Sequence, residues 1–87
     1  MEPNDWKDCP LVSIDPEVKH GAPVFKGTRL EVETVTDEVY AYMELRGQAE
    51  DRAIASALES FPTTPGGAAA IRDVLAYPEA HEHQLQP

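Results

Sequence analysis

The sequence predicts a mainly α-helical domain preceded by a short β element. Two observations support this. Residues 11–25 combine a brief apolar and polar alternation with turn residues, and three later segments repeat apolar residues every three or four positions. The 87 residues are enough for one small domain with a modest core. We therefore expect an N-terminal arm over residues 1–10, a β-hairpin with three helices over residues 11–78, and a polar tail over residues 79–87.

The predicted β element has two short strands. Leu11–Ile14 alternates apolar and polar side chains, and Val24–Phe25 could supply the partner strand. Gly21 and Gly27 mark the chain reversals because glycine adopts positive φ without steric cost. In the arm before this element, Trp6 is a lone large apolar residue that docks either on its own domain, which we favour, or on a neighbouring subunit.

Three amphipathic segments predict the helices. The first begins at Thr34, which has the spacing of a capping box, or a turn earlier within Leu30–Val32, and it ends before Gly47. Thr64 could cap the third helix, and Pro78 is expected to stop it. The apolar faces are Val32, Val35, Val39, Tyr42 and Met43 in the first helix, Ala53, Ile54, Ala57, Leu58 and Phe61 in the second, and Ala68, Ile71, Val74 and Leu75 in the third.

The charge balance bears on partners and location. Seven basic and sixteen acidic residues give a formal net charge of −9, which repels nucleic acid phosphates and suits a basic partner better. The acidic residues of the helices form either a solvated face or a surface complementary to a cationic protein. No apolar run reaches about 18 residues, and residues 1–10 lack the regions of a signal peptide. We expect a cytoplasmic protein without membrane contact.

The sequence contains no recognisable catalytic arrangement. His81 and His83 lie two positions apart in a polar segment, without the helical spacing or third ligand of a zinc site. Cys9 has no second cysteine to pair with, and Gly66–Gly67 lacks the lysine and hydroxyl residue of a phosphate-binding loop. We therefore expect no enzymatic activity, no catalytic residue, no metal and no cofactor.

Several segments resemble the signature of the prokaryotic domain of unknown function 433 family. They are Ile14–Glu17, His20–Gly21, Pro23–Val24, Lys26–Arg29 and Val32–Thr34, with weaker similarity at Phe61–Pro62, Ile71–Arg72 and Leu75–Tyr77. The resemblance implies a short β segment followed by a three-helix, homeodomain-like helix-turn-helix unit that is usually dimeric. It also implies an antitoxin of a type II toxin-antitoxin module, which binds a PIN-like ribonuclease toxin and its own operator DNA.

The candidate DNA- or partner-binding residues are Lys19, His20, Lys26, Thr28, Arg29 and Arg72. Thr28 is expected to be a turn hydroxyl, and His20 a hydrogen-bonded turn residue. Arg29 either presents its guanidinium to a partner or, as we favour, forms an ion pair with Asp15, Glu31 or Glu33.

The candidate partner anchors are large apolar residues, with the alternative that most of them belong to the domain's own core: Trp6, Tyr40, Tyr42, Leu45 and Tyr77. Together these features predict a homodimeric antitoxin-like protein that binds and neutralises a PIN-like ribonuclease toxin, with operator DNA binding as a secondary role. The alternative is a stand-alone helix-turn-helix transcriptional regulator. The helical segments offer few basic residues for groove reading, so any DNA contact is expected mainly from the β element.

Overall fold

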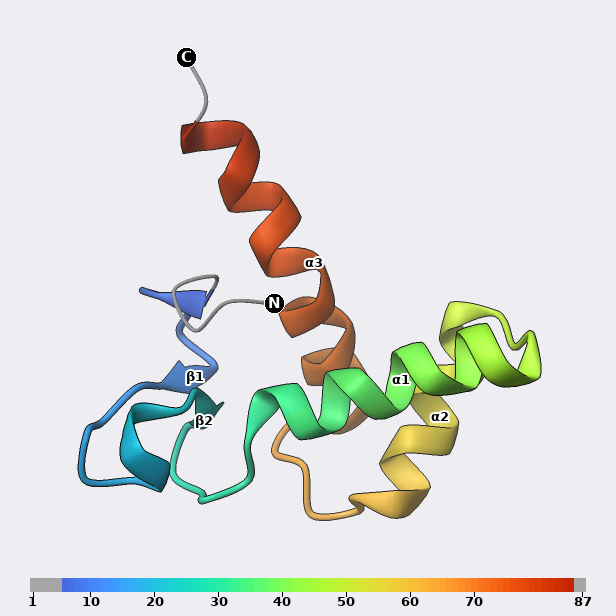
Figure 1. Ribbon diagram of the computed structural model, residues 1–87, viewed down its shortest axis with the longest axis horizontal. Coiled ribbons are helices and arrows are strands. Elements are labelled where there is room, and N and C mark those ends of the chain that lie inside the picture. The colour runs from blue at the N-terminus through green and yellow to red at the C-terminus, as the bar shows by residue number, and fades with distance from the viewer. Residues whose placement is uncertain (1–5, 86–87) are drawn as a thin grey trace.

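The computed structural model describes the backbone of residues 6–85 and the side chains of residues 6–77. Two strands, β1 (Val12–Ser13) and β2 (Val24–Phe25), precede α1 (Val32–Arg46), α2 (Glu50–Ser60) and α3 (Gly67–Leu85). Figure 1 shows α2 packed along α1, and α3 continuing well beyond the rest of the molecule at its C-terminal end. The prediction of a mainly helical chain with a short N-terminal antiparallel β element and three helices is confirmed.

The strand β2 has backbone partners on both sides. β1 and β2 pair antiparallel, with Val12 opposite Phe25. On the opposite edge of β2, the Phe25 N–H donates to the Leu30 carbonyl at 2.9 Å, and Val24 faces Glu31 in an isolated antiparallel bridge. The chain therefore returns alongside β2 immediately before α1 begins, and this pairing connects the β element to the helical body.

The start of α1 follows from this pairing. The helix begins at Val32, the earlier of the two starts that the sequence allowed, and Thr34 is an exposed residue inside it. The Val32 N–H donates to the Pro23 carbonyl at 2.9 Å, so the β element satisfies one of the four N–H groups that a helix start leaves without an internal partner. Gly47 ends the helix in the left-handed conformation with φ 63°, as predicted.

The connection between α2 and α3 differs from the prediction. Thr64 does not cap α3, because its Oγ1 donates to the Phe61 carbonyl at 2.7 Å and the helix starts only at Gly67. Gly66 and Gly67, the boundary residue at which α3 begins, have left-handed φ values of 79° and 60°, so regular right-handed helical geometry starts only after Gly67. A helix cannot run continuously from Pro65, so the proposed cap at Thr64 is wrong.

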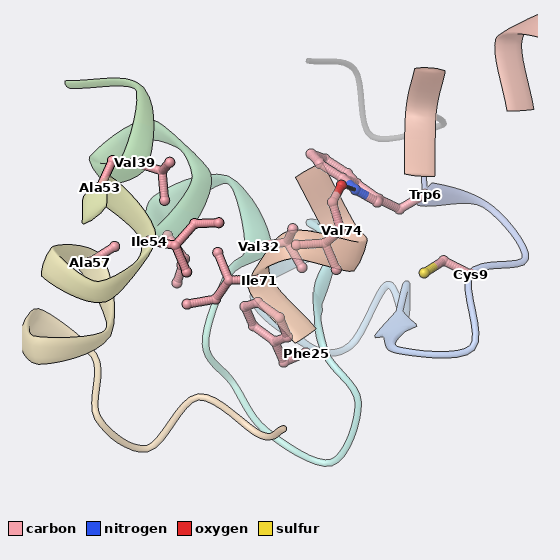
Figure 2. Close-up of a cluster of buried hydrophobic side chains, with 11 residues drawn as sticks. Trp6, Cys9, Phe25, Val32, Val39, Ala53, Ile54, Ala57, Ile71 and Val74 are labelled. Carbon is pink, nitrogen blue, oxygen red and sulfur yellow. Dashed lines mark hydrogen bonds between the residues drawn. The ribbon is translucent and has the colours of Figure 1, made fainter. Parts of the chain in front are cut away.

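The core lies where the three helices meet the β element (Figure 2). Each predicted apolar face contributes residues that are fully enclosed: Val32, Val35 and Val39 from α1, Ala53, Ile54 and Ala57 from α2, and Ile71 and Val74 from α3. Phe25 of β2 is also buried. The small side chains of Ala53 and Ala57 let α2 approach α1 closely.

The N-terminal segment of the described chain packs against α3. Trp6 is fully buried and its Nε1 donates to the Val74 carbonyl at 2.9 Å, so of the two alternatives for Trp6, docking on its own domain is the one observed. The helix α3 runs through Pro78 to Leu85, and the prediction that Pro78 ends it is wrong. Proline has no N–H to donate to the carbonyl four residues earlier, which is that of Val74, and the Trp6 indole supplies a donor to this same oxygen.

Candidate partner-binding surfaces

Charged side chains gather on two separate parts of the fold. The first, the basic loop surface, consists of Lys19, His20, Lys26 and Arg29, all exposed, in the two turns that flank β2. The second, the acidic helical surface, consists of the carboxylates of α1 and α2: Glu33, Asp37, Glu38, Glu44, Glu50, Asp51 and Glu59. The basic residues thus sit on the β element, whereas the acidic residues dominate the first two helices.

The turn after β2 is held by the Thr28 hydroxyl. Thr28 Oγ1 donates to the Phe25 carbonyl at 2.8 Å and accepts the Leu30 N–H at 3.1 Å. Thr28 is therefore the turn residue that the sequence predicted, and its hydroxyl is already occupied by the backbone. The Thr28 N–H also donates to the Phe25 carbonyl at 3.0 Å, so Lys26 is a central residue of this turn and Arg29 follows it directly, and both side chains are exposed.

Arg29 makes no ion pair with any residue whose side chain the structure describes, so the predicted pair with Asp15, Glu31 or Glu33 is wrong. Asp15 instead serves its own turn, where Oδ1 accepts the Glu17 N–H at 2.9 Å. An exposed ion pair gains about 0–1 kcal/mol, too little to override this local geometry. The Arg29 guanidinium consequently remains available to a partner.

The turn before β2 has an unusual backbone. Lys19, His20 and Gly21 have φ values of 51°, 57° and 87°, so two residues with side chains adopt the left-handed conformation that usually requires glycine. His20 lies in a turn as predicted, but within the described residues its imidazole has no hydrogen-bond partner. The turn places Lys19 and His20 next to each other in solvent.

Arg72 is separate from the basic loop surface. Its Nη2 lies 2.9 Å from Oδ1 of Asp51, so it links α3 to α2. The two side chains are 50% and 85% exposed, and an ion pair this accessible to water adds little stability. No local sequence pattern indicates this contact, because the partners are 21 residues apart on different helices.

The acidic helical surface is largely uncompensated. The same two helices contain seven carboxylates and only two arginines. Among the described side chains, Asp51 is the one carboxylate of this surface that forms an ion pair with a cation. Arg46 stacks over the Tyr42 ring, 5.4 Å from its centroid. Glu38 accepts a hydrogen bond from the Ser60 hydroxyl, which carries no charge. The surface therefore keeps most of its negative charge.

The five anchor candidates differ sharply in exposure. Trp6 is fully buried and has no surface to offer, whereas Leu45 is 84% exposed and Tyr40 is 37% exposed. Tyr42 is half-buried beneath Arg46. Leu45 lies seven residues after Glu38, two turns along the same side of α1, so the most exposed large apolar side chain of α1 shares a side of the helix with one carboxylate of the acidic helical surface.

Tyr77 belongs to the contact between α3 and the N-terminal segment. Its hydroxyl donates to the Lys7 carbonyl at 3.3 Å. Partial desolvation raises the pKa of Tyr77 above its ordinary value, and the negative charges of Cys9 and Asp8 raise this pKa further. Tyr77 is thus half-buried and already engaged within the chain.

A family model described as "Protein of unknown function (DUF433)" matches residues 12–51. The predicted resemblance is therefore confirmed over the β element, α1 and the first residues of α2. No curated protein and no solved structure matches the chain. The basic loop surface lies wholly within the matched segment, whereas Trp6, Arg72 and Tyr77 lie outside it. Among the described helices, none has the length and apolar character to cross a membrane.

Proposed function

We propose that this chain, which resembles the DUF433 family over residues 12–51, is an antitoxin-like protein that binds and neutralises a PIN-like ribonuclease toxin. In this proposal it acts in the cytoplasm as a homodimer, by docking and without catalysis. The resemblance suggests the class of partner. The observation that carries the proposal is the uncompensated acidic helical surface beside the exposed Leu45.

The charge of the acidic helical surface is complementary to that of a ribonuclease groove. A ribonuclease needs a cationic groove to hold the phosphates of its substrate, so a surface of unpaired carboxylates is attracted to that groove. Long-range attraction speeds encounter, and buried apolar anchors then determine how long the complex lasts. The acidic helical surface supplies the charge, and Leu45 with the partly exposed Tyr40 supplies apolar area at its edge.

The test is direct binding to the protein encoded by the neighbouring gene, measured by calorimetry together with inhibition of RNA cleavage. The double variant Asp37→Lys/Glu44→Lys should weaken binding at least tenfold. The control, Glu17→Lys/Asp73→Lys, changes net charge equally at exposed positions outside the acidic helical surface and should have much less effect. Absence of binding, or equal losses from the two double variants, would contradict the proposal.

One observation favours the alternative of a DNA-binding regulator. The basic loop surface is exposed, and Arg29 has no carboxylate partner among the described side chains. The side chains of Lys19, Lys26 and Arg29 can therefore contact phosphates. The test is titration of DNA from upstream of the gene at several salt concentrations. Submicromolar binding with a steep negative salt slope that becomes shallower in Arg29→Ala, and without capture of the neighbouring protein, would support the regulator.

A further inference from the structure

The helix α3 crosses a proline without ending. An interior proline removes the hydrogen bond to the carbonyl four residues earlier, and at Pro78 the carbonyl concerned is that of Val74. Val74 is fully buried, so water cannot replace the missing donor. A buried carbonyl left without a donor costs about as much as a lost hydrogen bond.

The donor comes from the opposite end of the chain. Trp6 Nε1 lies 2.9 Å from the Val74 oxygen, and the indole is fully enclosed. The next residues strengthen this contact: the Lys7 carbonyl accepts the Tyr77 hydroxyl at 3.3 Å, and Cys9 is buried in the same core cluster. We call Trp6–Cys9 the N-terminal clasp (Figure 2).

We propose that the N-terminal clasp is a conformational device that keeps α3 helical across Pro78, and that its release uncouples residues 79–85 from the rest of the helix. The Trp6 indole replaces the N–H that Pro78 lacks, so the clasp and the C-terminal part of α3 stabilise each other. A partner that draws Trp6 off the body destabilises the helix beyond Pro78. A partner that holds this part of α3 helical tightens the clasp by the same factor, because such coupling is reciprocal.

A simpler role for Trp6 is to fill space in the core, and a double-mutant cycle separates the two roles. Trp6→Phe removes the N–H and some volume. Pro78→Ala restores a backbone N–H that can donate to the Val74 carbonyl. The cost of lost volume is common to both backgrounds and cancels in the cycle, whereas the cost of the lost donor arises only when residue 78 is proline.

The measurement is amide hydrogen exchange of residues 79–85 in the full chain. With Pro78 present, Trp6→Phe should lower protection of these amides about 5- to 30-fold relative to the amides of α1 and α2. In the Pro78→Ala background the same change should lower their protection less than twofold. As a matched control, Pro65→Ala lies outside the helices and should leave the Trp6→Phe effect unchanged.

An equal effect of Trp6→Phe in both backgrounds would overturn the proposal, since Trp6 would then act by volume alone. If Trp6→Phe does not fold, recovery of folding in the Trp6→Phe/Pro78→Ala double variant supports the coupling. If neither folds, a synthetic chain with benzothienylalanine at position 6 keeps the ring size and lacks the donor. Unchanged protection of residues 79–85 in that chain would refute the clasp, and a selective loss would support it.

Discussion

The Thr28 hydroxyl holds the turn that presents Lys26 and Arg29, so replacing Thr28 by valine tests how that turn is built. The variant keeps the side-chain shape and removes the contacts to Phe25 and Leu30. The Phe25 carbonyl still accepts the backbone N–H of residue 28 at 3.0 Å. The Leu30 N–H, in contrast, loses the hydroxyl acceptor at a partly buried position. This loss should cost about 1–3 kcal/mol of unfolding free energy.

Thermal unfolding followed by circular dichroism measures this cost. For a chain of this size, each kcal/mol lowers the Tm by about 4–8 °C. Thr28→Ser retains the hydroxyl and should recover most of the stability. Thr34→Val is the matched control, because Thr34 is exposed in α1 and threonine and valine have similar helix propensities. A Thr28→Val variant that melts within experimental error of Thr34→Val would refute this account of the turn.

Three further predictions follow from the described contacts. Gly47→Ala should lose about 1–2 kcal/mol in urea unfolding, because φ is 63° and the added methyl group meets no neighbour that could compensate or clash. Arg29→Ala should change stability by less than about 0.5 kcal/mol, since no described carboxylate pairs with it, and a large fall in Tm would show a missed contact. Absorbance titration should show one tyrosine with a pKa above the usual tyrosine value. This titration step should be missing in Tyr77→Phe, which would assign it to Tyr77. Because its folded pKa is raised, the associated stability is present below the unfolded pKa near 10 and is lost as pH rises through the folded value.

The sequence predicted what depends on local patterns. The apolar spacing of Val32, Val35 and Val39 identified the buried face of α1, because a helix repeats every 3.6 residues whatever it packs against. The end at Gly47 was readable because glycine adopts left-handed backbone geometry easily. The turn role of Thr28 was equally local, since its hydrogen bonds reach only two and three residues along the chain.

The errors concern residues whose surroundings come from distant segments. Pro78 was predicted to end α3 because proline lacks the N–H that the Val74 carbonyl would otherwise accept. The donor that replaces this N–H is the Trp6 indole, which lies 68 residues from Val74 in the sequence. The charge pattern suggested a partner for Arg29, but it could not show that Asp15 serves its own turn. The left-handed backbone at Lys19 was also not predicted, because lysine, unlike the histidine that follows it, is not among the residue types enriched in that conformation.

The same contact between Trp6 and Val74 constrains the order in which the chain can fold. Closing a loop of 68 residues has an entropic cost that must be met before the contact contributes any stability. During synthesis, the Trp6 indole therefore stays exposed to solvent until α3 has emerged from the ribosome, even if the β element and α1 already associate. Fragments that end before Val74 should expose a large aromatic ring and bind chaperones or aggregate more readily than the 87-residue chain.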